Sequence, residues 1–234
     1  MRILLVRHGE SLGNVDKQIH ETTADHAVPL SVRGKEQALG AGWFLKDYFD
    51  AESTLVTKLD MKPRYPRVRL WVSPYRRTRE TADGLQQEVP ILTDRREHIL
   101  LCEQQFGLFD GIPNKDLPKR YPDAHAHYKK LEQFEGRFWA RMPMGESRFD
   151  VAARVHQAFG TFHRDASKHD IHTIVVVCHG VTLRAFVMMW CHLTPEWFEA
   201  EPNPSNCAIR LIKGGEDKGY IFEGFPRQEP RKNR

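Results

Sequence analysis

The sequence predicts an α/β protein: a three-layer α/β/α sandwich with a mostly parallel central sheet. Two observations support this prediction. Aliphatic runs at residues 3–6, 68–72 and 173–178 have the length and composition of buried strands. Segments with helical periodicity follow these runs, and strands that alternate with helices are typical of a parallel sheet covered on both faces.

The size of the chain is consistent with one domain. It has 234 residues, 40% of them hydrophobic, and its sequence contains no internal repeat and no Pro/Gly-rich linker. We expect a single domain over residues 1–226 with a lid-like insertion at about 102–146. Residues 227–234 are strongly basic, and we expect them to form a disordered tail.

Four elements are expected after the first strand at residues 3–6. Ser31 can cap a helix that runs to about residue 49, because apolar residues such as Ala38 and Leu45 recur at helical spacing. Residues 50–66 are polar and interrupted by proline, which predicts a surface connection. The remaining three elements are a strand at 68–72, a helix at about 75–88 and a short strand at 90–93.

The second half of the chain begins with a stretch of faded periodicity, residues 101–145, which we interpret as a lid. Most of its aromatic side chains are expected to pack beneath it. Ser147 can cap a helix that runs to about residue 168. The run 173–178 predicts a central strand, and the helix expected at 181–190 is apolar nearly all round, which indicates that it is buried. Strands near 207–212 and 220–225 complete the predicted sheet.

Composition and cysteine spacing indicate the setting of the protein. Lysine and arginine number 35 against 31 acidic residues, so the net charge is only +4, and we expect no nucleic-acid partner. The aliphatic run at 3–6 is too short to span a membrane, and no signal peptide precedes it, so we expect a cytoplasmic monomer or homodimer with no membrane partner. No CxxC spacing occurs, which predicts reduced thiols at Cys102, Cys178, Cys191 and Cys207.

Basic side chains follow three of the predicted strands. Arg7 and His8 come directly after the first, Arg77 follows the second and His179 follows the third. Because parallel strands end at one edge of a sheet, we expect these groups to converge. Guanidinium groups match phosphoryl oxygens, and a neutral imidazole nitrogen can attack phosphorus. The sequence therefore predicts a phosphoryl-binding site, where Gly9 would let the backbone approach the ligand.

A site for phosphoryl transfer also needs a proton donor, because an alkoxide leaves poorly unless it is protonated. Glu103 stands at the start of the insertion and is the expected acid. Glu97 and Asp110 are the competing carboxylates. His125 and His127 form a His-x-His pair near Asp123, but no second cluster of ligands accompanies them, so we expect no metal site there.

The motifs of the chain form an ordered series that extends from residue 3 to about 212. They are Arg7-His8-Gly9 with Asn14, Ser73-Pro74 with Arg77-Thr78, Glu103 with Gly107 and Gly111, Gly145-Glu146-Ser147, and His179-Gly180 with Arg184. Together they resemble the histidine phosphatase superfamily, in the branch that includes cofactor-dependent phosphoglycerate mutases. Such a series is far more specific than any one of its members.

The resemblance implies a role for each matching residue in a single catalytic domain. His8 would be the nucleophile and become phosphohistidine, and Glu103 would protonate the leaving oxygen and then activate water. The residues implied to hold the phosphoryl group are Arg7, Asn14, Arg77, His179 and Gly180. The resemblance implies neither a metal nor a cofactor, because positioned cations take the role that Mg²⁺ plays in other phosphoryl-transfer sites.

Three departures from the mutase pattern favour a phosphatase. Phe106 stands three residues after the acid, where mutases typically carry a tyrosine, and Gly13 stands where they tend to have a tryptophan. The Thr-Gly-Trp stretch usual in their next loop is absent. Lys115 and the pair Lys119-Arg120 could still meet a substrate carboxylate. We therefore predict a phosphomonoesterase acting on a small-molecule phosphate ester, with mutase-type transfer as the alternative.

Two readings from other classes remain. The segment from Cys178 to Arg184 matches the signature of cysteine-dependent phosphatases, with a cysteine and an arginine separated by five residues after a strand and before a helix. This reading leaves His8 and Arg77 without a role. A phosphate-binding module without turnover would keep the cations and lack the acid, and Glu103 speaks against it.

Overall fold

The computed structural model describes residues 1–58 and 67–226 and has a six-stranded sheet with the strand order β3-β2-β4-β1-β5-β6. The strands are β1 (Arg2–Arg7), β2 (Val68–Val72), β3 (Arg95–Glu97), β4 (Thr173–Cys178), β5 (Ile209–Lys213) and β6 (Glu216–Phe222). The pairs β3–β2, β2–β4 and β4–β1 are parallel, whereas β5 and β6 join as antiparallel strands. The predicted mostly parallel α/β architecture is confirmed.

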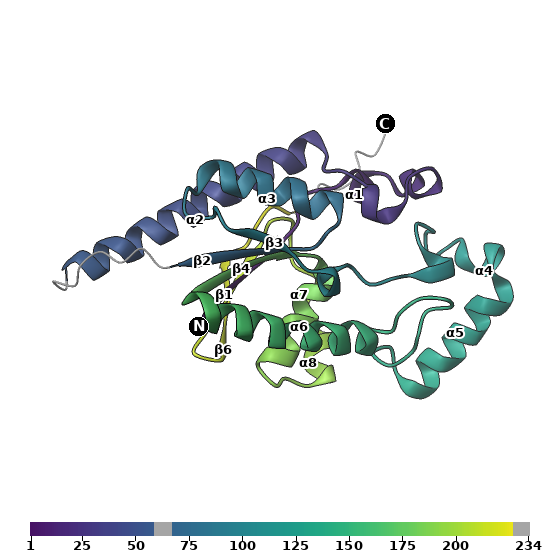
Figure 1. The fold of residues 1–234 in the computed structure, drawn as a ribbon. Coiled ribbons are helices and arrows are strands. Elements are labelled where there is room, and N and C mark those ends of the chain that lie inside the picture. The colour runs from purple at the N-terminus through teal and green to yellow at the C-terminus, as the bar shows by residue number, and fades with distance from the viewer. Residues whose placement is uncertain (59–66, 227–234) are drawn as a thin grey trace.

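Two helical layers cover the sheet (Figure 1). One contains α2 (Val32–Lys58) and α3 (Arg76–Glu88), and the other contains α6 (Arg148–His169), α7 (Gly180–Trp190) and α8 (Pro195–Ala200). Alternate side chains of β1 enter different cores: Ile3 and Leu5 pack on the α6/α7 side, and Leu4 and Val6 pack on the α2/α3 side. This two-sided burial explains why the inner strands are continuous apolar runs.

The segment between β3 and α6 forms the side of the molecule farthest from the C-terminal end of α2 (Figure 1). It contains the short 3-10 helices η3 (Ile99–Leu101) and η4 (Gly107–Phe109), followed by α4 (Leu117–Arg120) and α5 (Pro122–Glu135). Phe109 and Tyr128 pack in a small core of their own, and Phe138 joins the main core. Phe134 and Trp139 are exposed instead, so the expected packing holds for only part of the aromatic set.

The remaining short elements follow β1 directly. They are α1 (Leu12–Val15), η1 (Lys17–Glu21) and η2 (Asp25–Ala27). They lie close to the start of α3 at the edge where the parallel strands end (Figure 1). Both predicted helix caps are present, because Ser31 Oγ accepts a hydrogen bond from Gly34 N, and Ser147 Oγ accepts one from Asp150 N.

Four boundaries differ from the predictions. The helix α2 continues to Lys58 instead of ending near residue 49, because no glycine or proline occurs between residues 43 and 62. The strand predicted at 90–93 is wrong, because the strand that pairs with β2 is β3 at Arg95–Glu97. Leu92 lies before this strand and is buried in the core. The last two strands are shifted to 209–213 and 216–222, because Gly214 and Gly215 form a tight turn with positive φ between them.

Other expectations concern regions or partners that the structure covers only in part. The predicted tail at 227–234 and residues 59–66 of the connection predicted at 50–66 lie outside the described residues, whereas residues 50–58 belong to α2. In the part of the chain that is described, no helix is long and apolar enough to cross a membrane. The four cysteines are all unpaired.

A buried ion pair links the sheet to its helical layer and generates a stability prediction. Arg69 of β2 is almost fully buried, and its Nε donates to Asp165 Oδ2 of α6 at 2.7 Å. Arg69 also forms an ion pair with Asp94, whose side chain is 52% exposed, so removing Asp165 would leave the buried Arg69 charge only partly compensated. We expect Asp165→Ala to lower the free energy of unfolding by about 3 kcal/mol, measured by urea denaturation.

The exposed pair between Arg79 and Glu97 provides the matched control. Glu97→Ala should cost less than about 1 kcal/mol, because solvent screens exposed ion pairs. Equal losses for the two variants would show that burial of Arg69 is not the cause.

Candidate active site

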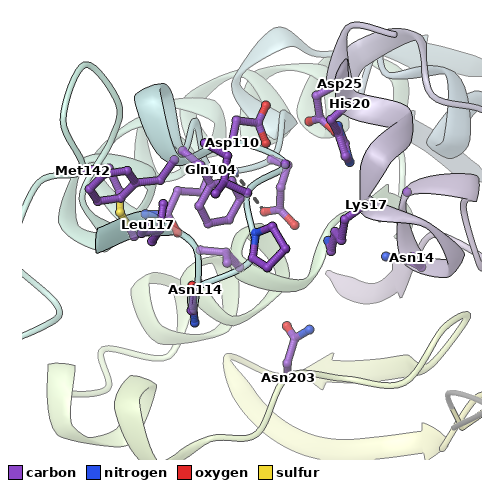
Figure 2. A pocket seen from close by; sticks show the side chains of 18 of the residues that line it. Asn14, Lys17, His20, Asp25, Gln104, Asp110, Asn114, Leu117, Met142 and Asn203 are labelled. Atoms are coloured by element: carbon purple, nitrogen blue, oxygen red, sulfur yellow. Dashed lines mark hydrogen bonds and ion pairs between the residues drawn. The ribbon is translucent and has the colours of Figure 1, made fainter. Parts of the chain in front are cut away.

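A cavity of about 810 Å³ opens at the edge where β1, β2 and β4 end. Five of the predicted site residues line it: Arg7, His8, Asn14, Arg77 and Glu103. Figure 2 shows the pocket with side chains from two sides of the molecule, the segment after β1 and the insertion. The structure therefore brings together groups that are as much as 96 residues apart in sequence (7 to 103).

His8 is held in one tautomer by its own loop. Its Nδ1 lies 2.6 Å from the Gly9 carbonyl oxygen, which can only accept a hydrogen bond, so Nδ1 carries the proton. In a neutral ring Nε2 then keeps its lone pair. The backbone N–H of His8 donates to Cys178 O at 3.0 Å, which continues the β1–β4 pairing one residue beyond the strands. The structure thus presents a buried imidazole with a nucleophilic Nε2.

His179 lies directly behind His8. The ring centroids are 5.2 Å apart, and the rings meet edge to face. His179 is fully buried and does not line the cavity, unlike the other predicted side chains. Burial lowers its pKa well below the usual range, and the positive charges of Arg77, Arg154 and Arg7 lower it further. His179 is therefore neutral.

The neutral ring of His179 leaves one nitrogen for a further contact. Its Nε2 lies 2.8 Å from Ser73 Oγ. Its Nδ1 is buried and has no hydrogen-bond partner among the described residues. If the Ser73 hydroxyl donates to Nε2, the ring proton is on Nδ1.

Two arginines and an asparagine give the cavity its anion-binding character. Arg7 donates to the Pro204 carbonyl oxygen, and Arg77 forms an ion pair with Asp25. Both guanidinium groups are more than nine-tenths buried. Asn14 Oδ1 accepts hydrogen bonds from Ser11 N at 3.1 Å and Asn206 Nδ2 at 3.3 Å, so its amide is fixed by the loop.

The surroundings of Glu103 favour its protonated form. Burial raises the pKa of its carboxyl group, against the lowering effects of the Gln104 N–H, Arg77 and Arg7. Arg154 of α6 holds the loop, since its Nη2 donates to the Glu103 carbonyl oxygen at 3.0 Å and its Nη1 to Leu100 O at 2.7 Å. Arg154 also forms an ion pair with Glu146 at 2.8 Å. The sequence analysis missed Arg154, although Glu146 belongs to one of the quoted motifs.

The competing carboxylates occupy different surroundings. Glu97 pairs with Arg79 outside the cavity, and this hydrogen bond lowers its pKa, so it is a poor acid. Asp110 lines the cavity, and burial followed by repulsion from Asp25 raises its pKa. Among the three carboxylates considered, only Glu103 and Asp110 can deliver a proton inside the pocket.

Two predicted glycines approach protein groups. A Cβ on Gly9 would lie 2.5 Å from the Gly34 carbonyl oxygen, so Gly9 lets the loop after β1 approach α2, and the expected approach to a ligand stays a prediction. A Cβ on Gly180 would overlap the Asn203 side chain, which lines the cavity, whereas Gly180 itself does not. Gly180 therefore makes room for Asn203, a pocket residue that the sequence analysis missed.

The cysteine-phosphatase reading meets two obstacles. Cys178 is fully buried in the core, and burial raises the pKa of its thiol, so the thiolate is disfavoured. The helix α7 begins at Gly180, and Arg184 Nη1 donates to the carbonyl oxygens of Phe198 and Glu201 near the end of α8. The arginine of the signature is thus engaged in holding two helices together.

The comparison with known proteins identifies relatives over nearly the whole chain. A sequence profile described as "Histidine phosphatase superfamily (branch 1)" matches residues 3–223. The phosphoglycerate mutase-like protein AT74H of Arabidopsis thaliana is 34% identical over 232 residues, which cover 94% of this chain and 76% of the relative. The similar protein AT74 of the same plant is also 34% identical, but this chain spans only 66% of its length.

More distant relatives include phosphatases. The broad-range acid phosphatase DET1 of Saccharomyces cerevisiae is 25% identical over 284 residues, with 90% of this chain and 84% of the relative covered. Among solved structures, mycobacterial glucosyl-3-phosphoglycerate phosphatase superposes with a TM-score of 0.65 at 21% identity, covering 97% of this chain and 99% of the other. At this identity the superposition shows a shared fold.

The geometry predicts that the cysteine at the end of β4 is dispensable for turnover. Cys178→Ser keeps the size of the side chain and removes the thiol, so we expect activity on 4-nitrophenyl phosphate to stay within about threefold of the wild type. The measurement is kcat/KM, with a thermal melt to record the stability of each variant. A folded but inactive Cys178→Ser protein would restore the cysteine mechanism.

Proposed function

This chain belongs to the histidine phosphatase superfamily, and from that premise we propose that it is a phosphomonoesterase that hydrolyses a small-molecule phosphate ester through phosphohistidine on His8. The observation that carries the proposal is the tautomer of His8, whose Nδ1–H is bound to the Gly9 carbonyl oxygen so that Nε2 keeps its lone pair inside a cationic cavity. The name of the yeast relative, a broad-range acid phosphatase, is consistent with the proposal.

In the first step the lone pair of His8 Nε2 forms a bond to phosphorus. The ester P–O bond breaks, its electron pair goes to the leaving oxygen, and the carboxylic proton of Glu103 is transferred to that oxygen. Arg7 and Arg77 stabilise the negative charge of the phosphoryl oxygens in the transition state. The raised pKa of Glu103 keeps the proton available for this step.

In the second step water replaces the alcohol. Glu103, now a carboxylate, takes a proton from the water while the water oxygen bonds to phosphorus. The P–N bond breaks, and its electron pair returns to Nε2 of His8. Inorganic phosphate leaves and Glu103 is again protonated. Positioned cations meet the phosphoryl charge in both steps, and neither step invokes a metal ion.

Mutase-type transfer is the second candidate, and features of the pocket disfavour it. Phe106 lines the cavity and offers no hydroxyl group. Lys115, Lys119 and Arg120, which might have met a substrate carboxylate, are not among the lining residues, and Arg120 instead lies 3.7 Å from Glu21. The names of the two plant relatives keep the mutase alternative in view.

A panel of phosphate esters tests the proposal directly. Wild type is expected to release inorganic phosphate in excess EDTA, and His8→Ala is expected to abolish release, because the covalent step cannot proceed without its nucleophile. The matched control is His127→Ala, which removes an exposed histidine outside the cavity and should retain full activity. Isomerisation of a phosphoglycerate without phosphate release would establish the mutase instead, and substrate binding without turnover would establish a binding module.

The role of Glu103 predicts a dependence on the leaving group. An acid matters more when the departing oxygen carries negative charge poorly, so Glu103→Gln should lower kcat/KM by roughly 10² to 10⁴ on an alkyl phosphate and far less on 4-nitrophenyl phosphate. Equal small losses on both substrates would exclude Glu103 and leave Asp110→Asn as the next variant to measure.

The same role fixes the direction of the pH dependence. The first step needs protonated Glu103, and burial raises the pKa of that group. The kcat/KM for an alkyl phosphate should therefore fall as pH rises through the raised pKa, and this basic limb should disappear in Glu103→Gln. A limb that persists in the variant would belong to another group.

A further inference from the structure

Arg77, one of the arginines that line the cavity, uses part of its guanidinium group in an ion pair. Arg77 Nη1 donates to Asp25 Oδ1 at 2.9 Å and to the Asp25 carbonyl oxygen at 2.7 Å, and Nη2 donates to Asp25 Oδ2 at 3.1 Å. Both residues line the pocket. Asp25 belongs to none of the motifs that carry the family resemblance, and the reaction proposed above gives it no role.

The geometry of a guanidinium group shows what this contact leaves available. The group has five N–H donors in one plane. Asp25 uses both Nη1 donors and one Nη2 donor, which is the end of the fork. The remaining donors are Nε–H and the second Nη2–H, and these form a parallel pair suited to two oxygens of one phosphoryl group. Among the described residues, the hydrogen bonds of the Arg77 side chain come from Nη1 and Nη2 and all go to Asp25, so they leave this edge open.

We propose that Asp25 is a positioning residue for Arg77: it holds the end of the guanidinium fork so that the Nε–Nη2 edge meets the phosphoryl group. The inference rests on the proposed function in taking a phosphoryl group as the ligand of this pocket. The Tyr75 ring supports the same orientation, because Arg77 Cζ lies 4.9 Å from its centroid. Arg77 is thus fixed along one edge by a carboxylate and across one face by an aromatic ring.

Asp25 is itself held by packing around His20. His20 Nδ1 lies 3.8 Å from Asp25 Oδ1, and Figure 2 shows the two side chains together at one side of the pocket. The His20 ring fits between two glycines: a Cβ on Gly13 would lie 2.6 Å from Nε2, and one on Gly111 would lie 2.5 Å from His20 Cβ. The turn of the insertion at Gly111 therefore packs against His20, and His20 contacts the Asp25 carboxylate that holds Arg77.

In the opposite role, the Asp25 carboxylate would compete with phosphate for Arg77, and electrostatics decides between the two roles. A carboxylate and a phosphate on opposite edges of one guanidinium group repel each other, but the Asp25 side chain is 21% exposed and the positive charge of Arg77 lies between them, so solvent and the cation weaken this repulsion. An unanchored arginine would instead lose rotamer freedom on binding phosphate. The balance favours positioning.

Calorimetric titration with inorganic phosphate tests the proposal without turnover. Its outcome is therefore independent of whether His8 forms phosphohistidine. Asp25→Asn keeps the shape of the side chain and removes its charge, and we expect the Kd for phosphate to rise on the order of tenfold. Asp25→Ala is the second variant and should show at least the same loss. Thermal melts establish that each variant is folded.

A double-mutant cycle then separates positioning from a general structural effect. If Asp25 acts only through Arg77, adding Asp25→Asn to Arg77→Ala should change the Kd by less than about twofold. In turnover assays Asp25→Asn should raise KM with little change in kcat, because the contact to phosphoryl oxygens is made in both the ground state and the transition state. A structural defect spread over the site would instead lower kcat as well.

The control removes a carboxylate, Glu97 of β3, that pairs with a different arginine of α3. Glu97 bonds Arg79 through both oxygens, at 2.7 and 2.6 Å, on the surface of α3, so Glu97→Gln breaks a similar fork away from the pocket and should leave phosphate binding unchanged. Tighter phosphate binding in Asp25→Asn would identify Asp25 as a competitor and overturn the proposal. Unchanged binding, or losses that add in the cycle, would overturn it as well.

Discussion

The site depends on the in-register parallel pairing of β1 with β4. Arg7 is aligned with Cys178, and the next residues, His8 and His179, follow their strands at the same level. The hydrogen bond from His8 N to Cys178 O fixes this alignment and brings the two imidazole rings to 5.2 Å. A slip of one residue would exchange the buried faces of β1, where Ile3 and Leu5 belong to one core and Leu4 and Val6 to the other. The two cores therefore enforce the spacing of the two histidines.

The same alignment brings basic side chains close together, and their positive charge is compensated in two ways. His179 is neutral, because burial and the neighbouring arginines lower its pKa. Arg7 and Arg77 cannot do so, and each is held by an oxygen acceptor, the Pro204 carbonyl for Arg7 and Asp25 for Arg77. A dianionic ligand would enter a pocket in which the cations are already oriented, so little reorganisation accompanies its binding. Preorganisation of this kind is the usual source of catalysis in phosphoryl transfer.

The sequence was informative where structure is local, and less so where it depends on distant contacts. The strands at 3–6, 68–72 and 173–178 were predicted well because each is mostly apolar and is buried on both faces of the sheet. The edge strand β3 was misplaced because Arg95, Arg96 and Glu97 face solvent and carry no apolar signal. Arg154 was missed for another reason: it acts through backbone carbonyls 51 and 54 residues away, which no local pattern reveals. Asp25 and His20 lie in short 3-10 turns whose position is set only by packing against Arg77 and the insertion.

The two ends of the pocket are built from structurally separate parts of the molecule. The end that would hold the phosphoryl group rests on the main sheet, whose cores are fully buried. The other end is walled by residues such as Phe109, Leu117 and Tyr128, which belong to the small core of the insertion. Substitutions in that small core can reshape the space for the organic group without disturbing the strand register that sets His8 and His179. Contacts that cross this division include the packing of Gly111 against His20 beside Asp25 and the hydrogen bond from Gln105 Nε2 to Tyr75 Oη at 2.6 Å. Changes in the insertion are therefore expected to reach the phosphoryl end through His20 and Tyr75, because these two side chains touch both parts.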